Sequence, residues 1–281
     1  MPDAGPIAVL PHRPLTVGEL LDSAVLLLRA QARVLVPIAV VLAAAEQFLV
    51  LQPLRLAAGT VPPIWWLSDG SFATYWLLLT TGAATEAMII MLLGNPAARA
   101  GAAALLGRTA RPGEVLHLAG GRWGGTVLFA LVVGGLMSVA AFCGPLWFAG
   151  FALLGAVAPA LVVDRVPLHR VLPRAGALAT RSGMRAGMIR LLGYLGWWIL
   201  RVGLASGTIL GLTQLGLVDD YWAIPVALLV WTAVNGIAYP ALACLDAVLH
   251  LETRIRTEGL DILLARAPAG TPEPALLAAE R

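Results

Sequence analysis

Four polar side chains interrupt the long apolar runs of this 281-residue chain, and they are the residues most able to do chemistry. They are Glu46, Glu86, Arg201 and Asn235. A charge in the middle of such a run is costly unless a partner or water stabilises it, so we predict that Glu86 and Arg201 pair. The pair would either fix the register of two helices, which is the interpretation we favour, or line a polar pathway or an amphiphile-binding cavity.

The residue patterns of common hydrolases and nucleotide-binding enzymes do not occur. A phosphate-binding loop of the Walker type needs a lysine, and all 19 basic residues are arginine. The four histidines are far apart in sequence, and there is no Gly-x-Ser-x-Gly elbow. We therefore predict a protein without enzyme activity, metal ion or cofactor.

The composition is typical of an integral membrane protein. Hydrophobic residues make up 59% and charged residues 12%, whereas about 25% of residues are charged in soluble domains. The apolar residues form runs of about 20, the length of a helix that crosses a bilayer. The net charge of +3 does not indicate nucleic-acid binding, because the arginines lie at the ends of these runs. The expected fold class is an all-α, polytopic membrane protein.

We predict a six-helix membrane domain over residues 1–266 and a disordered tail, rich in Ala and Pro, over residues 267–281. An amphipathic helix over about residues 15–30 should lie on the inner membrane surface, with a capping box formed by Thr16 and Glu19. The six predicted spanning segments are Val34–Leu51, Ser71–Leu93, Gly124–Phe142, Leu146–Val163, Ile189–Leu215 and Ala223–His250.

The distribution of arginine between the connections predicts the topology. The connections Arg99–Arg122 and Arg165–Arg190 are rich in arginine, whereas the alternate ones hold only Arg55 and contain Asp219 and Asp220. Because cytoplasmic loops retain basic residues, we expect both termini to be cytoplasmic, in the cytoplasmic membrane of a bacterium.

Two spaced motifs predict contacts. Four arginines, spaced four, seven and four residues apart, would share one face of a surface helix: Arg170, Arg174, Arg181 and Arg185. They either hold anionic lipid headgroups or set the membrane topology. Three glycines recur every four residues, a spacing that lets membrane helices approach closely. We favour packing within the monomer over a dimer interface for these glycines, which are Gly203, Gly207 and Gly211.

Three stretches resemble a known family. Arg13–Asp22 looks like the opening of the actinobacterial membrane proteins labelled glycerophosphoryl diester phosphodiesterase membrane domain. Glu252–Asp261 is similar to that family's Asp-Leu-Arg-Ile-Arg-x-Glu-Gly-Leu-Asp signature, and Arg174–Arg181 resembles its basic stretch, although Ala175 and Gly176 replace the usual Ser and Trp. The resemblance implies the membrane architecture but no catalytic residues, because the phosphodiesterase barrel and its motifs are missing apart from His12-Arg13.

The terminal motif predicts a structural clamp. Its residues are Glu252, Arg254, Arg256, Glu258, Gly259 and Asp261. We expect Gly259 to end the last long helix as a C-terminal cap. We also expect one of the three acidic residues to pair with an arginine between Arg165 and Arg190.

Taken together, these patterns favour a non-enzymatic subunit or scaffold of a bacterial envelope-related membrane complex. The main alternative is a carrier or binder of lipids or other amphiphiles through a polar cavity, and a membrane-embedded enzyme is the least favoured. The expected partners are membrane lipids, anionic ones among them, and other membrane proteins, but not nucleic acid. The sequence leaves the oligomeric state open. A polar cavity between helices would favour the binder, whereas a dry bundle with an apolar groove would favour the subunit.

Overall fold

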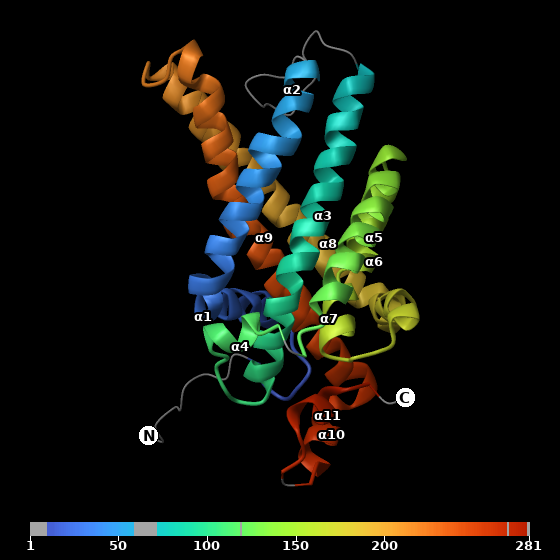
Figure 1. The fold of residues 1–281 in the computed structure, drawn as a ribbon. Coiled ribbons are helices and arrows are strands. Elements are labelled where there is room, and N and C mark those ends of the chain that lie inside the picture. Colours follow the sequence, from blue (N-terminus) through green and yellow to red (C-terminus); the bar gives the residue numbers. More distant parts are fainter. Residues whose placement is uncertain (1–9, 59–71, 119, 269, 280–281) are drawn as a thin grey trace.

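The structure is a computed structural model that describes residues 10–58, 72–118, 120–268 and 270–279. Every regular element within these ranges is a helix, which confirms the all-α fold class (Figure 1). In chain order the elements are α1 (Val17–Ala44), the π-helix η1 (Ala45–Leu51), α2 (Gln52–Ala58), α3 (Phe72–Leu105), α4 (Pro112–Leu116), α5 (Trp123–Phe142), α6 (Leu146–Leu154), α7 (Val157–Val162), α8 (Leu168–Gln214), α9 (Asp220–Glu258), α10 (Leu260–Arg266) and α11 (Glu273–Leu277).

The described helices expose large apolar side chains and bury several charged ones. Five helical segments are long and apolar enough to cross a membrane, namely 17–57, 72–105, 123–142, 168–214 and 221–258. Leu49, Val139 and Leu215 on their outer surfaces are 74%, 65% and 75% exposed, whereas Glu86 and Arg201 are buried. Apolar side chains facing outward and charges facing inward are characteristic of a membrane-embedded bundle.

The fourth predicted spanning segment forms two short helices rather than one long one. α6 and α7 together cover Leu146–Val162, which is too short to be counted with the five candidate spans. The helix breaks at Gly155, where any side chain would collide with the guanidinium of Arg190. Arg190 also donates to the carbonyl of Phe151, which a continuous helix would offer to the Gly155 N–H. The six predicted crossings are therefore not confirmed.

The N-terminal amphipathic helix and the first span are one continuous element instead of two. The helix runs without interruption from Val17 through η1 and α2, and Figure 1 shows its dark-blue first part lying across the base of the bundle. The predicted capping box is confirmed, because Glu19 accepts from the Thr16 N–H at 2.8 Å and Thr16 Oγ1 accepts from the Glu19 N–H at 3.3 Å.

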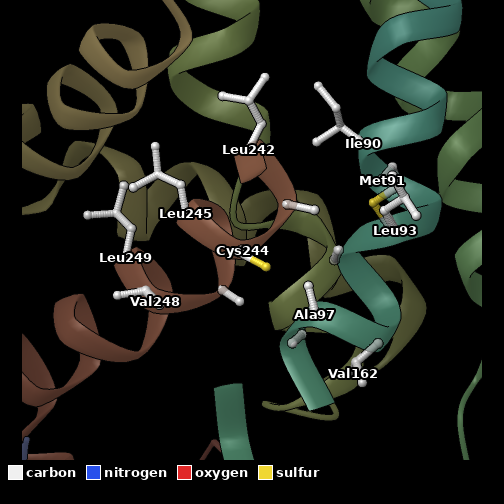
Figure 2. Close-up of a cluster of buried hydrophobic side chains, with 14 of the residues drawn as sticks. Ile90, Met91, Leu93, Ala97, Val162, Leu242, Cys244, Leu245, Val248 and Leu249 are labelled. Carbon is white, nitrogen blue, oxygen red and sulfur yellow. The ribbon is translucent and has the colours of Figure 1, made fainter. Parts of the chain in front are cut away.

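The core lies where α9 crosses α3 and α7. Figure 2 shows α9 side chains such as Leu242 and Cys244 gathered with Ile90 and Leu93 of α3. The backbones approach closely beside them: a Cβ added to Gly94 would lie 2.5 Å from the Cβ of Ala158 on α7. This closely packed lower half holds the helices in place for the more open upper half.

The C-terminal residues dock on the bundle, so the predicted disordered tail is wrong over residues 270–279. Leu277 of α11 is buried, and its carbonyl accepts from Arg254 Nη1 at 2.6 Å. Glu273 forms an ion pair with Arg108 at 2.5 Å. The signals of disorder, Ala and Pro, here belong to a short helix whose apolar side chain and carbonyl both find partners.

Candidate functional site

A cavity of about 430 Å³ lies between η1, α2, α3, α6, α8 and α9. The upper parts of α8 and α9 lean away from α3 in Figure 1, and they share a small apolar cluster of their own, separate from the main core. Aromatic side chains form much of the cavity wall, among them Trp76, Trp147 and Phe148. All four polar residues singled out in the sequence also line it, namely Glu46, Glu86, Arg201 and Asn235.

Glu86 and Arg201 form a buried ion pair at the cavity wall. Arg201 Nη2 lies 2.7 Å from Glu86 Oε1, and the hydroxyl of Tyr194 donates to the same carboxylate at 3.4 Å. The guanidinium also lies over two aromatic rings, with Cζ 5.8 Å from the ring centre of Tyr194 and 5.5 Å from that of Tyr239. Together the carboxylate and the two rings offset the desolvation of a buried arginine.

Glu46 is the centre of a second polar cluster. Its carboxylate accepts from Thr85 Oγ1 at 2.7 Å, from the hydroxyl of Tyr239 at 2.7 Å and from Gln47 Nε2 at 3.1 Å. Because three neutral donors from three elements surround it, Glu46 is held in place without a direct ion pair within the described residues. Tyr239 connects the two clusters, since it bonds to Glu46 and lies beside Arg201.

The π-helix η1 brings the Glu46 cluster to the cavity. Its seven residues, Ala45–Leu51, take the wider π-turn between two α-helical stretches. Glu46, Gln47 and Leu51 are all buried and all line the cavity. π-turns inside α-helices occur frequently at functional sites, because they redirect side chains locally.

Arg55 is the polar residue that the sequence placed elsewhere. It was assigned to an outer connection, but it lies on α2 with only 7% of its surface exposed and lines the cavity. Arg55 Nη2 donates to Gln47 Oε1 at 2.6 Å. Among the described residues no carboxylate lies within ion-pair distance of it.

The terminal motif forms the predicted clamp at the opposite end of the bundle. Glu258 pairs with Arg174 and with Arg181, each at 2.5 Å, and Glu252 pairs with Arg185 at 3.0 Å. Asp261, the third predicted partner, forms no ion pair within the described ranges.

Gly259 and Arg256 complete the clamp. Gly259 caps α9 with a φ of 64°, as predicted. Arg256 pairs with Glu252 at 2.7 Å and donates to the Leu15 carbonyl at 3.0 Å, which ties the start of the chain to the end of α9.

Asp164, which the sequence did not single out, lies beneath the clamp. Its side chain is fully buried and contacts Arg174 at 2.8 Å, Arg254 at 2.9 Å and His250 at 2.8 Å. Burial opposes ionisation of this carboxyl, but His250 and the two guanidiniums outweigh it and lower the pKa of Asp164 to about 2. Asp164 directly follows an apolar run in the sequence, so its position indicated the polar end of a membrane span rather than the centre of a buried charge cluster.

The four arginines predicted to form one stripe do not share a helix face. Backbone angles leave the α region between Arg181 and Met184, where Ser182 and Gly183 have φ of 53° and 69°. Arg174, Arg181 and Arg185 contact the acidic residues of the clamp, and Arg170 is exposed. Lipid contacts of these residues stay a prediction, with Arg170 the best placed for them.

The three glycines of α8 do not pack within the monomer, so that favoured interpretation is wrong. A Cβ added at Gly203, Gly207 or Gly211 would meet no described atom within 4 Å. All three residues are exposed.

Signals for the missed residues of the site were present but indirect. Arg55 is the one arginine on the arginine-poor side of the predicted topology. Tyr194 and Tyr239 lie inside predicted spans, whereas tyrosine in membrane helices gathers at the interfaces. Each departure from the expected pattern marked a residue of the site.

Comparisons with protein-family models, curated proteins and solved structures found no match to this chain.

Proposed function

We propose that this protein binds the polar end of a lipid or another amphiphile in the cavity between η1, α3, α8 and α9. The observation that carries the proposal is the combination of a 430 Å³ cavity with an aromatic wall and a buried polar floor. Ligand pockets typically enclose about 300–1,000 Å³, with apolar walls and a few placed polar groups. The role is that of a carrier or receptor, and no catalytic residue is assigned.

The location of the cavity supports an amphiphile over a fully water-soluble ligand. The helices around it expose apolar side chains, such as Leu49 at 74% and Leu204 at 56%. A ligand that reaches Glu86 and Arg201 therefore lies inside a shell that faces hydrocarbon. An apolar chain on the ligand would contact the tryptophan walls while its polar end contacts the two clusters.

Mass spectrometry of the intact protein, released from mild detergent, tests the proposal. The wild type should retain an amphiphile, and Gly82→Phe should lose it, because Gly82 lines the cavity and the new ring would fill that space. Gly203→Phe is the matched control, since it adds the same ring on an exposed helix face. Equal retention by both variants would refute binding in this cavity.

The proposed setting is a bacterial cytoplasmic membrane, with the clamp on the cytoplasmic side. The clamp holds Leu15 close to Arg185 and Arg256, and α11 contacts Arg254, so both ends of the described chain lie at the arginine-rich end. Six crossings, with α6 and α7 as the short fourth, would place both termini inside.

Single-cysteine labelling tests this topology. In a background that lacks the two native cysteines, a cysteine at Asp219 should react with an impermeant reagent added outside intact cells, and one at Arg170 should not. Reaction of Arg170→Cys from the outside would overturn the orientation.

A second candidate role, as a subunit of a membrane complex, is favoured by the α8 glycines. Their face is exposed and apolar, with Leu204 and Leu210 beside it. Such a face allows a second transmembrane helix to approach closely. Loss of a co-purified membrane protein in Gly207→Leu, with amphiphile retention unchanged, would support this role in addition to binding. The resemblance to the glycerophosphoryl diester phosphodiesterase membrane domain is compatible with either role and stays a proposal.

A further inference from the structure

The cavity contains buried hydrogen-bond donors that no described group satisfies. Arg55 Nη1, Arg201 Nε and Trp147 Nε1 are buried and have no hydrogen-bond partner within the described chain. Arg55 and Arg201 are only 7% and 4% exposed. Buried polar atoms are nearly always bonded to protein, water or a ligand. Within the described chain, the cavity therefore lacks acceptors for these three buried donors.

The two carboxylates of the cavity do not supply these acceptors. Glu86 is engaged by Arg201 Nη2 and Tyr194, and Glu46 is engaged by Thr85, Tyr239 and Gln47. Arg55 is left with an amide oxygen as its hydrogen-bond partner, at 2.6 Å. A buried guanidinium without a carboxylate is destabilising unless an anion completes it.

Two acceptors of the cavity residues also lack a hydrogen bond within the described chain, and one of them, Glu86 Oε1, already belongs to the ion pair with Arg201. Asn235 Oδ1 is buried and has no donor among the described residues, and Asn235 is 3% exposed. A molecule that completes the site must therefore present oxygen acceptors to the arginines and a hydroxyl or amine donor to Asn235. Water could occupy single positions, but the apolar walls leave it few other partners.

We infer that the ligand is an amphiphile whose headgroup carries an oxyanion, a phosphate or a carboxylate, together with a hydroxyl. The oxyanion accepts from Arg55 and Arg201, and the hydroxyl donates to Asn235. Guanidinium–oxyanion hydrogen bonds are charge-assisted and about twice as strong as neutral ones. This inference rests on the proposed function and specifies the class of ligand.

Quenching of tryptophan fluorescence by brominated lipids tests the inference on the full-length protein in detergent micelles. Trp76, Trp147, Trp198 and Trp231 line the cavity, so a brominated chain inside it should quench saturably. Brominated phosphatidylglycerol supplies the oxyanion and the hydroxyl, and brominated diacylglycerol supplies a hydroxyl without charge. We expect the phosphatidylglycerol to bind at least ~10-fold more tightly, because hydrogen bonds to a charged group are stronger than those between neutral groups.

Arg55→Gln is the decisive variant. It should weaken phosphatidylglycerol binding by ~10-fold or more and leave diacylglycerol binding unchanged. Arg170→Gln removes an exposed arginine and is the matched control, with no change expected. If Arg55→Gln does not fold, Asn235→Leu replaces it, and should weaken phosphatidylglycerol more than a brominated fatty acid, which has no hydroxyl.

The outcomes separate the inference from the function on which it rests. Saturable quenching by diacylglycerol and phosphatidylglycerol with equal affinity, or an unchanged Arg55→Gln variant, overturns the oxyanion and leaves amphiphile binding in place. No saturable quenching by any of these lipids overturns the proposed function itself. Competition by soluble glycerol phosphate at the same concentration as the lipid would show that the site takes free anions, and would overturn the amphiphile part.

Discussion

Replacing Asp164 tests the buried charge cluster at the arginine-rich end most directly. The side chain is fully buried and touches Arg174, Arg254 and His250 at 2.8–2.9 Å. Asp164→Asn keeps the size of the side chain but removes its charge, so two guanidiniums lose the anion that they share. We expect the variant to fold with a lower free energy of unfolding at neutral pH.

The size of the effect follows from the pKa of Asp164. It is about 2 in the folded protein, against an ordinary value of 3.8. At about 1.36 kcal/mol per pKa unit, the ionised carboxylate contributes about 2 kcal/mol to stability. Because folding lowers this pKa, the contribution is complete above about pH 4 and is lost as the pH falls through about 2.

Unfolding in detergent, followed by circular dichroism, measures both parts of the prediction. At pH 7 the variant should be less stable than the wild type by about 2 kcal/mol, and the difference between their melting temperatures should shrink between about pH 4 and pH 2. Asp261→Asn is the matched control, because Asp261 lies near the same end without an ion pair among the described residues. A difference that is independent of pH, or absent at pH 7, would refute the assigned role of the charge.

Three further sets of substitutions test other parts of the bundle. Glu86→Ala leaves the buried guanidinium of Arg201 without its carboxylate and should lower the free energy of SDS-induced unfolding by about 3–5 kcal/mol. Adding Arg201→Met should recover part of this loss. Equal stability of the single and double variants would contradict the pairing. Gly94→Val should lower the free energy of unfolding by about 1–3 kcal/mol, because the new side chain overpacks against α7. Gly203→Ala, on the open face of α8, should leave the stability unchanged or raise it by up to about 1 kcal/mol. Thermal unfolding compares the two variants, and an equal loss of stability in both would contradict the packing difference. Glu258→Arg should lower the melting temperature of the isolated protein, because three arginines then face a fourth; an unchanged melting temperature with loss of a bound partner would make the motif a docking site.

The parts of the fold that repeat along a helix could be predicted from the sequence. Apolar runs indicated the membrane helices, and the Thr16 and Glu19 spacing indicated the start of the first. The break at Gly155 could not be predicted in this way, because it depends on Arg190, which approaches from another helix. The docking of α11 likewise depends on long-range contacts, such as that between Leu277 and Arg254.

The parts of the site marked by an unusual residue type could be predicted from the sequence, whereas the part that depends on an irregular backbone could not. Glu86 and Arg201 were conspicuous because charges are rare in apolar runs. The π-helix left no comparable sign, since Ala45–Leu51 reads as ordinary helix in composition. Without it, the positions of Gln47 and Arg55 relative to Glu46 could not be derived.

The π-helix makes the site depend on how the backbone is wound as well as on side-chain identity. In an α-helix each residue turns the chain by about 100° and advances it by about 1.5 Å. A π-turn closes its hydrogen bond one residue later than an α-turn, so it takes up one additional residue. If the residues of η1 were wound as an unbroken α-helix, everything after Leu51 would therefore rotate by about 100°, carrying Arg55 away from Gln47 although neither residue had been changed. The ligand-binding geometry is thus encoded partly in the hydrogen-bond register of one helical turn, and a chain that loses this π-turn could keep its membrane fold while losing the arginine that completes the cavity.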